Sequence, residues 1–284
     1  MKVLDKVTRL SEILTKHSFE DAHKEAEIII TTATSIKSPD LYVNEFELTE
    51  QDIALIDDMI CQRLKGRPLQ YITSEVDFFD LHLKVGDGVF IPRPETEYMV
   101  DQVIKIMTQK GFNRLSRLKI LDLCTGSGCI ALTLARYFVN ASVIATDISL
   151  VALKYAKINR DIHRVSNVSF IAGDLFSPLK DYHFHLIISN PPYIATSEID
   201  NLQIEIKDYE PKIALDGGED GIDFYRKILP KAGHYLKKDG LLILEIGLGQ
   251  SDELKRLALS YGYGKVSFIK DYSGIDRIFI AGGD

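Results

Sequence analysis

The sequence lacks several features that would place the chain in a specialised class of protein. Its three cysteines, Cys61, Cys124 and Cys129, are too few for a disulfide framework and do not have the spacing of metal ligands. No run approaches the roughly 20 apolar residues of a membrane-spanning helix. The N-terminal residues mix charged and apolar positions and offer no small-residue cleavage site, so we expect no signal peptide. These absences favour a cytoplasmic protein with no membrane association and no bound metal.

Basic residues are also fewer than acidic residues. The chain carries 34 Lys and Arg against 41 Asp and Glu, which gives a net charge of -7. A broad nucleic-acid surface depends on neutralising phosphates, so we expect no direct nucleic-acid binding. The 284 residues are 45% hydrophobic and 26% charged, without internal repeats or low-complexity tracts, which is typical of a globular protein with a sizeable core.

The hydrophobic pattern divides the chain into three parts. Residues 1–75 have apolar positions at helical spacing, which predicts a small α-helical bundle. Thr49 to Asp52 has the pattern of a helix cap, and Gly66 and Pro68 supply a stop. Residues 76–92 predict a β-hairpin linker that turns at Gly86-Asp87-Gly88.

Residues 93–284 alternate between strand and helix patterns. Buried-strand runs cover 119–123, 142–146, 168–172, 185–189 and 241–245, and helical runs start at Pro94 and cover 130–138 and 149–159. Two further strand-like runs in 265–282 are joined by Tyr272-Ser273-Gly274, with no room for a crossover helix. The pattern predicts an α/β fold: a doubly wound, Rossmann-like, seven-stranded sheet that ends in an antiparallel hairpin.

A glycine-rich loop follows the first strand of this sheet. In Thr125-Gly126-Ser127-Gly128 the backbone can approach a ligand closely, at the start of a helix with unsatisfied N–H groups. Asp147 ends the next strand, where its carboxylate can accept both hydroxyls of a ribose. A dinucleotide and S-adenosylmethionine both satisfy this geometry. The loop favours S-adenosylmethionine, because Cys124 occupies the first glycine position of a dinucleotide fingerprint and residues 129–131 lack the third.

A third cofactor contact is expected after the next strand. Asp174 can accept a hydrogen bond from the exocyclic amine of adenine, with Leu175 or Phe176 against the ring. All three contacts would lie at the carboxyl ends of strands, where ligands bind in open α/β sheets.

The segment Asn190-Pro191-Pro192-Tyr193 carries the clearest sign of chemistry. An amide or aromatic-amine nitrogen is a poor nucleophile because its lone pair is delocalised, so a site that uses one must orient it. The Asn190 side-chain oxygen and the Pro191 carbonyl can each accept one N–H of a planar NH2 group, and Tyr193 can stack on its face. This arrangement aims the nitrogen at an electrophilic methyl group in line for displacement.

Four segments resemble the release-factor glutamine methyltransferases, the HemK/PrmC family. They are Ile91-Pro92-Arg93-Pro94-Glu95-Thr96-Glu97, the loop DLCTGSGCIA from Asp122, Asn190-Pro191-Pro192-Tyr193, and Ala214-Leu215-Asp216-Gly217-Gly218-Glu219-Asp220-Gly221. The resemblance covers nearly the whole chain, including Gly66-Arg67-Pro68-Leu69-Gln70-Tyr71-Ile72. Cys124 is a departure, because many members have glycine there.

The resemblance implies an enzyme in which S-adenosylmethionine donates its methyl group to the N5 side-chain amide of the glutamine in the Gly-Gly-Gln motif of peptide-chain release factors. Residues Thr125 to Gly128, Asp147 and Asn190 would then hold the cofactor, and Asn190 to Tyr193 would hold the glutamine. Residues 93–284 would form the methyltransferase domain. Because a glutamine side chain is too small to distinguish one protein from another, we expect the helical domain to recognise the substrate protein; the alternative is that it only covers apolar surface of the sheet domain.

Several alternatives remain open at this stage. A glutamine methyltransferase acting on a ribosomal protein shares the catalytic loop, and a DNA adenine methyltransferase shares Asn-Pro-Pro-Tyr but needs a basic surface. A nicotinamide-dependent oxidoreductase and a non-catalytic binding protein fit less well. Glu95 and Glu97 could form an acid pair or only favour a helix N-terminus. Residues 245–249 read as an ordinary strand-to-helix turn.

Overall fold

The computed structural model describes residues 1–43, 46–180 and 182–282, which form two compact units. The smaller unit consists of residues 1–74 together with a distant segment, 203–209. The larger unit consists of residues 75–202 and the chain from 210 onward. The return of 203–209 to the helical unit has no sign in the local sequence pattern.

The smaller unit is a helical bundle. Its helices are α1 (Val3–Lys16), α2 (Ala22–Thr34), α3 (Asp40–Val43), α4 (Glu50–Leu64), α5 (Leu69–Thr73) and α9 (Ile204–Lys207). The predicted cap of α4 is confirmed: Thr49 Oγ1 accepts from the Asp52 main-chain N–H, and Asp52 Oδ2 accepts from the Thr49 N–H. The apolar stripes of α1, α2 and α4 meet in one core, with Leu14, Ile29 and Ile56 fully buried.

A buried arginine fastens segment 203–209 to this bundle. Arg63 donates to Glu25 through Nε and Nη2, over 2.7 and 2.9 Å, and to Glu205 through Nη1, over 3.2 Å. Its guanidinium also lies over the Phe19 ring, 4.3 Å from the centroid. A buried guanidinium needs several partners to offset its desolvation. The hydrogen bond to Glu205 supplies one of them and thereby attaches segment 203–209 to the bundle.

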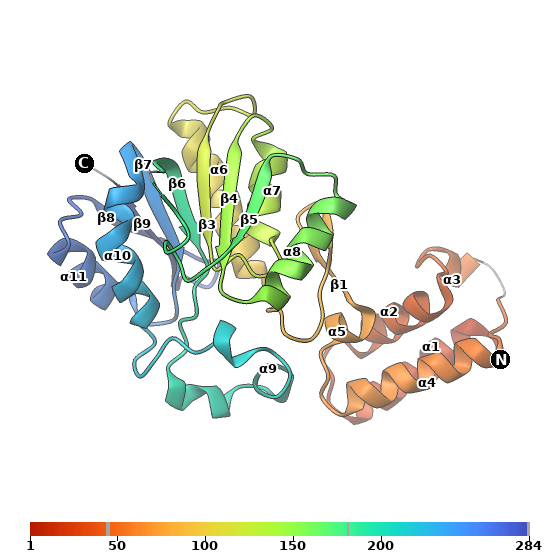
Figure 1. Ribbon diagram of the computed structural model, residues 1–284. Coiled ribbons are helices and arrows are strands. Elements are labelled where there is room, and N and C mark those ends of the chain that lie inside the picture. Colours follow the sequence, from red (N-terminus) through yellow and green to blue (C-terminus); the bar gives the residue numbers. More distant parts are fainter. Residues whose placement is uncertain (44–45, 181, 283–284) are drawn as a thin grey trace. The chain divides into compact units, whose positions relative to one another are not determined.

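The larger unit is built on the predicted seven-stranded sheet, in the order β5-β4-β3-β6-β7-β9-β8 (Figure 1). Its strands are β3 (Lys119–Leu123), β4 (Ser142–Asp147), β5 (Val168–Ala172), β6 (Phe184–Ser189), β7 (Leu236–Glu245), β8 (Val266–Lys270) and β9 (Asp276–Gly282). The first five are parallel, whereas β9 pairs antiparallel with both β7 and β8. The predicted terminal hairpin is therefore confirmed.

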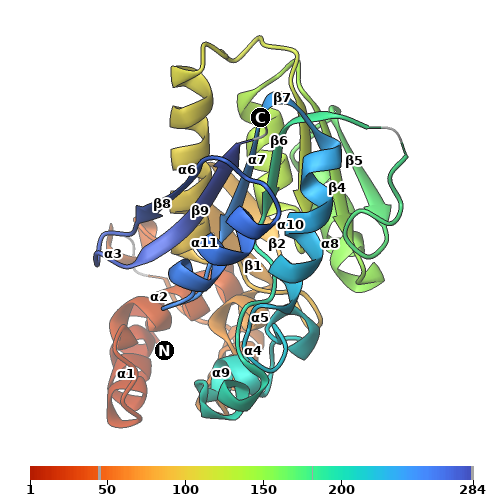
Figure 2. The ribbon, with the colours of Figure 1, turned by 90° about the vertical axis from the view of Figure 1, so that its left-hand side faces the viewer.

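Helices cover both faces of this sheet. They are α6 (Pro94–Gln109), α7 (Cys129–Tyr137), α8 (Leu150–Ile162), α10 (Asp223–Tyr235) and α11 (Ser251–Ser260). Successive strand residues point to opposite faces, so Ile120 joins the core beneath α6 and α7, whereas Leu121 joins the core beneath α10 and α11. Figure 2 shows α6 on one side of the sheet and α10 and α11 on the other.

The predicted linker hairpin exists, but its turn lies elsewhere. Strands β1 (Glu75–Phe78) and β2 (Leu81–Lys84) pair antiparallel and turn at residues 79–80, not at Gly86-Asp87-Gly88. Phe79 adopts a φ of 53°, and its N–H donates to Glu97 Oε1 over 2.6 Å. A tertiary hydrogen bond thus supports a left-handed residue that local propensity disfavours. The Gly86 region instead packs against α8, because a Cβ on Gly86 would lie 2.2 Å from the Tyr155 hydroxyl.

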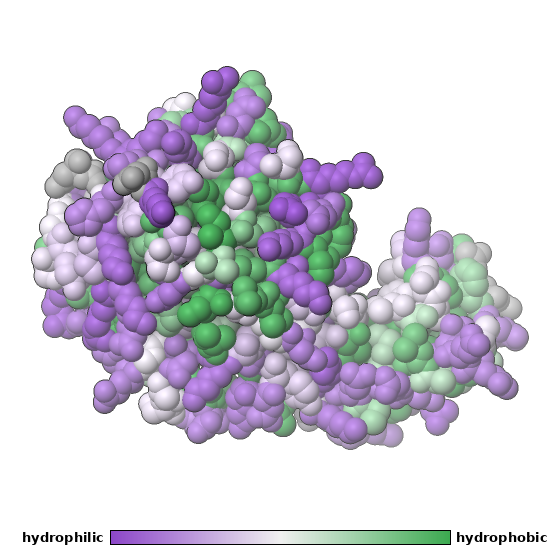
Figure 3. All heavy atoms as spheres, viewed as in Figure 1, coloured by the Kyte–Doolittle hydropathy of each residue, from purple (hydrophilic) through white to green (hydrophobic). Residues whose placement is uncertain are grey.

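Part of the larger unit's surface is apolar. Figure 3 shows hydrophobic residues gathered near the lower middle of its visible face, surrounded by hydrophilic ones. Ile148, Leu150 and Val151, which directly follow β4, are 56, 72 and 47% exposed. Exposed apolar groups beside a strand's carboxyl end suit contact with a ligand. Within the described ranges, no helix is long and apolar enough to cross a membrane.

Candidate active site

The sequence-predicted site residues lie at one edge of the larger unit's sheet. Strands β3 to β7 run parallel, so their carboxyl ends share that edge. The glycine-rich loop follows β3, Asp147 ends β4, Asp174 follows β5, and Asn190 follows β6. The end of β7 adds Glu245, which the sequence reading treated as part of an ordinary turn. Ligands of open α/β sheets bind at this edge.

The glycine-rich loop uses left-handed backbone at several positions. The φ angles of Cys124, Gly126 and Gly128 are 56°, 57° and 85°. Cys124, where the chain departs from the family pattern, therefore adopts a left-handed backbone conformation that glycine adopts more easily. The N–H of Thr125 donates to the Thr146 carbonyl over 3.0 Å, which ties the loop to the neighbouring strand.

A buried carboxyl group supports this loop from below. The Thr125 hydroxyl donates to Asp122 Oδ2 over 2.6 Å, and the Asp122 side chain is fully buried. Burial raises the pKa of Asp122 to about 7, because an ionised carboxylate loses its hydration there, although the Thr125 hydrogen bond opposes that shift.

Asp147 joins the loop to the end of β4. Its Oδ2 accepts from the Gly126 N–H and its Oδ1 from the Ser149 N–H, each over 2.8 Å. Burial raises the pKa of this carboxyl, and the backbone hydrogen bonds oppose the shift. A carboxylate oxygen has two lone pairs, so each oxygen retains acceptor capacity for a ligand hydroxyl.

The three residues expected to contact adenine, which follow β5, have different surroundings in the structure. Asp174 is exposed, and Leu175 is buried with a φ of 50° and accepts from the Thr146 hydroxyl at its carbonyl, over 3.0 Å. Phe176 is in the core, where its ring stacks on Tyr235 with centroids 4.8 Å apart. Leu175 belongs to the same buried cluster, so a contact of Leu175 or Phe176 with adenine stays a prediction.

A chain of hydrogen bonds connects Asn190 with two residues far away in the sequence. Asn190 Nδ2 donates to Thr96 Oγ1 over 3.0 Å, and the Thr96 hydroxyl donates to Glu245 Oε2 over 2.7 Å. The Tyr193 hydroxyl donates to the other carboxylate oxygen, Oε1, over 3.2 Å. Glu245 is 1% exposed, and burial raises its pKa to about 7. Burial likewise raises the pKa of Tyr193, whose phenol stays protonated.

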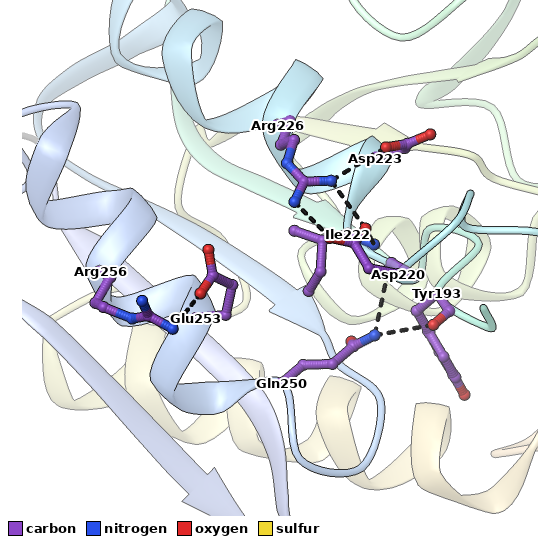
Figure 4. Close-up of polar contacts among 9 residues, drawn as sticks. Tyr193, Asp220, Ile222, Asp223, Arg226, Gln250, Glu253 and Arg256 are labelled. Atoms are coloured by element: carbon purple, nitrogen blue, oxygen red, sulfur yellow. Dashed lines mark hydrogen bonds and ion pairs between the residues drawn. The ribbon is translucent and has the colours of Figure 1, made fainter.

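The loop after β6 is held from behind by Gln250 and by two glycines. Gln250 Nε2 donates to the carbonyls of Tyr193 and Gly221, over 2.9 and 3.2 Å, and Figure 4 shows this side chain reaching from the start of α11 to Tyr193. In Figure 4, Arg226 pairs with Asp220, which lies in the segment Gly217 to Gly221, here called the glycine loop. A Cβ on Gly221 would lie 2.4 Å from the Tyr193 carbonyl oxygen, so glycine there lets this loop lie directly on the Tyr193 backbone.

The segment Arg93 to Glu97 positions neighbouring parts of the site. Arg93 pairs with the buried carboxylate of Glu210, which also accepts from the Ile91 N–H over 3.2 Å. Glu97 accepts from the Phe79 N–H, and Glu95 is exposed. Glu97 therefore has a structural partner, whereas Thr96, between the two glutamates, reaches Asn190.

Two family models match the chain. The model described as the PrmC N-terminal domain matches residues 6–73, and the model described as the methyltransferase small domain matches residues 95–206. A relative from Thermodesulfovibrio yellowstonii, named release factor glutamine methyltransferase, is 45% identical over 99% of this chain and 98% of its own length. A relative of the same name from Fusobacterium nucleatum is 37% identical over 98% of this chain and 78% of its own length.

The chain belongs to the release factor glutamine methyltransferase family. The resemblance inferred from the sequence motifs is thus confirmed. Among solved structures, a methyltransferase from Pyrococcus furiosus aligns with a TM-score of 0.55 and 22% identity, covering 80% of this chain and all of that one. This likeness confirms the methyltransferase fold of the larger unit.

Thr96 and Glu245 join the candidate site through these hydrogen bonds, and sequence reasoning did not single them out. Each had a weak local signal: Thr96 lies inside the motif Pro-Glu-Thr-Glu, and Glu245 is a lone charge at the end of the apolar run LLILE. Within the described part of the chain, no three His, Cys, Asp or Glu side chains gather in a way that could hold a metal ion.

Substitution of Gly217 tests whether the glycine loop positions Tyr193 in this family member. A Cβ on Gly217 would lie 2.8 Å from the Tyr193 Cα and 2.9 Å from the Gly221 Cα, so the main chain must shift. We expect Gly217→Ala to destabilise the fold by about 1 to 3 kcal/mol and to slow turnover more than it weakens cofactor binding. Gly233→Ala is the matched control, because its Cβ would meet nothing within 4 Å. Equal turnover in the two variants would contradict this role.

Proposed function

We propose that the protein transfers a methyl group from S-adenosylmethionine to the N5 side-chain amide of the glutamine in the Gly-Gly-Gln motif of peptide-chain release factors. The observation that carries this proposal is the hydrogen bond from Asn190 Nδ2 to Thr96 Oγ1, which fixes the Asn190 amide just after the end of β6. The names of the relatives support the same substrate class. The amide nitrogen would form a bond to the methyl carbon as the carbon–sulfur bond breaks, which gives S-adenosylhomocysteine, N5-methylglutamine and one proton released from that nitrogen.

The glycine-rich loop has features that suit the cofactor. The space beside Gly126 is open, because a Cβ there would meet nothing within 4 Å. The side chains of Asp122 and Ser127 are buried and keep polar oxygen atoms at this loop. Buried polar groups need polar surroundings, so the loop suits a polar ligand better than an apolar one.

S-adenosylmethionine supplies an electrophilic methyl group on a sulfonium centre when it is bound. We assign its ribose hydroxyls to Asp147 and its polar amino-acid end to the loop of Thr125 to Gly128 and to Asn190. Asp174 and Leu175 would contact the adenine. These assignments place every proposed contact at the carboxyl edge of the sheet.

The substrate glutamine would be oriented by the loop after β6. The Asn190 side-chain oxygen faces away from Thr96, because the amide nitrogen is used in that contact. This oxygen and the Pro191 carbonyl would accept the two N–H groups of the glutamine amide, and the Tyr193 ring would lie on its face. Pro191 and Pro192 restrict the backbone between these groups and keep the acceptors at a constant separation. The nitrogen is then held in line with the methyl group.

A labelling experiment tests the proposed function. The full-length protein is incubated with methyl-labelled S-adenosylmethionine and, in separate reactions, with release factors, ribosomal proteins or DNA. We expect label on release factors only, and mass spectrometry should place it on the glutamine of Gly-Gly-Gln. Label confined to a ribosomal protein or to adenine in DNA would contradict the proposed substrate.

We further propose that the helical unit recognises the substrate protein. A glutamine side chain is too small to distinguish one protein from another, so selectivity requires contacts outside the catalytic loop. Val43 on α3 is 79% exposed and gives this unit an apolar residue for such a contact.

Val43→Asp is the variant that tests recognition by the helical unit. If Val43 contacts the release factor, a charge there should lower kcat/KM on the folded factor by roughly tenfold, which corresponds to about 1.4 kcal/mol. The same variant should methylate a short Gly-Gly-Gln peptide at the wild-type rate. Val139→Asp, at a valine 46% exposed in the larger unit, is the matched control. Equal losses on the peptide and the folded factor would contradict a recognition role.

A further inference from the structure

Glu245 accepts hydrogen bonds from hydroxyl groups in two separate motifs. Thr96, in Pro-Glu-Thr-Glu, donates to Oε2 over 2.7 Å, and Tyr193, in Asn-Pro-Pro-Tyr, donates to Oε1 over 3.2 Å. The Tyr225 hydroxyl donates to the main-chain carbonyl of Glu245 over 2.9 Å, which holds the end of β7. A single buried carboxyl group thus connects the two motifs.

The direction of the hydrogen bonds follows from the number of protons available. A threonine hydroxyl has one proton to donate, and Thr96 directs it to the Glu245 carboxylate, which is acceptor-only when ionised. The Thr96 oxygen must therefore accept from Asn190, and the NH2 end of that amide faces Thr96 over 3.0 Å. The carbonyl end of the same amide is then free to accept a hydrogen bond from a substrate.

We propose that Glu245 is a positioning residue for methyl transfer: through Thr96 it determines which end of the Asn190 amide faces the glutamine, and through its hydroxyl contact it holds the Tyr193 ring. The inference rests on the proposed function of the preceding subsection. If the amide were reversed, its NH2 group would face the N–H groups of the substrate, and two donors would oppose each other.

The location of Glu245 argues against a role in stability alone. A carboxylate that is 1% exposed at the end of an apolar strand loses its hydration, and such a group destabilises the fold when it is ionised. The raised pKa, about 7, means that the folded state binds this proton more tightly than the unfolded chain does. Its effect on stability therefore becomes less favourable as the pH rises from about 4.5 through 7.

Charged and titratable groups surround Glu245 on several elements. Glu95 on α6 raises its pKa and Arg277 on β9 lowers it, while the hydroxyls of Thr96 and Tyr193 lower it as hydrogen-bond donors. Cys129 on α7 and Tyr225 on α10 also face it and feel its charge. Burial is the largest contribution, so the carboxyl group titrates near neutral pH and not near its usual value.

Glu245→Gln is the decisive variant. A glutamine amide can donate to Thr96, so the Thr96 proton becomes free to point at Asn190 and the Asn190 amide can reverse. We expect kcat on a release factor to fall by about tenfold or more, because a misplaced reacting group can lose up to about a hundredfold. The dissociation constant of S-adenosylhomocysteine should change by less than about threefold, and at pH 8 the melting temperature should not fall, since the variant has no buried charge.

Variants of Thr96 test the proposed path independently of Glu245. Thr96→Val removes the hydroxyl and should lower kcat as Glu245→Gln does, whereas Thr96→Ser keeps the hydroxyl and should retain most of the activity. If both residues act through one chain of hydrogen bonds, the double variant Glu245→Gln with Thr96→Val should lose little more than the more impaired single variant. Should Glu245→Gln fail to fold, the comparison of Thr96→Val with Thr96→Ser decides the question.

The pH profile gives a readout that a purely structural role would not move. Wild-type kcat should rise with pH through about 7 as Glu245 ionises, and this limb should be missing in Glu245→Gln. Asp122 also titrates near 7, but it does so in both proteins, so the difference between them isolates Glu245. A Glu245→Gln variant with wild-type kcat and an unchanged limb would overturn the inference alone. A wild-type protein that transfers no methyl group to glutamine would instead overturn the proposed function, and this inference with it.

Discussion

Asn190→Ala should reduce methyl transfer to a release factor by at least about a hundredfold, which corresponds to about 2.7 kcal/mol of transition-state stabilisation. The variant loses the side-chain oxygen that is proposed to accept from the glutamine amide. The affinity for S-adenosylhomocysteine should fall much less, because Asp147 and the glycine-rich loop keep their mutual contacts. Single-turnover kinetics and calorimetry on the same preparation measure the two effects separately.

Ser189→Ala is the matched control for Asn190→Ala. Ser189 is the preceding residue and is buried, and its hydroxyl donates to the Leu123 carbonyl over 2.7 Å, so the substitution disturbs the end of β6 without touching the proposed acceptor. We expect this variant to lose stability but to keep most of its turnover. If Asn190→Ala turned over within about threefold of wild type, its assigned role in orienting the nucleophile would be wrong.

The sheet was predictable from the sequence because most of its strands are short, mainly apolar runs bounded by polar residues. The strands 119–123 and 168–172 have the predicted bounds, and the Ser149 cap at the start of α8 forms as expected. The helix α10 was not predicted, because Pro230 and Gly233 interrupt its helical pattern. Burial of Tyr225, Ile228 and Leu229 against the sheet outweighs those local preferences.

The parts of the site that follow a motif were predictable, whereas the contacts between motifs were not. Asn190 and Asp147 could be placed at strand ends because the strand pattern itself is local. The Thr96 to Glu245 hydrogen bond joins residues 149 positions apart, and nothing in either segment identifies the other. The turn at Phe79 depends in the same way on Glu97, which lies in another element. Long-range hydrogen bonds of this kind require the folded structure.

Asp147→Ala should weaken binding of S-adenosylhomocysteine by about 1.5 to 3 kcal/mol, the range for hydrogen bonds to a charged group, or roughly ten- to 150-fold. The carboxylate is proposed to accept both ribose hydroxyls while it holds the Gly126 and Ser149 N–H groups. Asp147→Asn keeps one acceptor oxygen and nearly the same shape, so its loss should be intermediate. Calorimetry with S-adenosylhomocysteine measures each affinity directly.

Asp174→Ala is the variant to compare with Asp147→Ala, because it removes a proposed ligand contact without disturbing the glycine-rich loop. Asp174 is exposed, so its removal should cost only the proposed adenine contact and should weaken binding less than Asp147→Ala does. The same titrations with NAD distinguish the two cofactor classes that the glycine-rich loop allows. Tight binding of NAD together with no measurable affinity for S-adenosylhomocysteine would show that the loop serves a dinucleotide. The titrations with both ligands are needed because the ribose contact at Asp147 is common to the two and does not separate them.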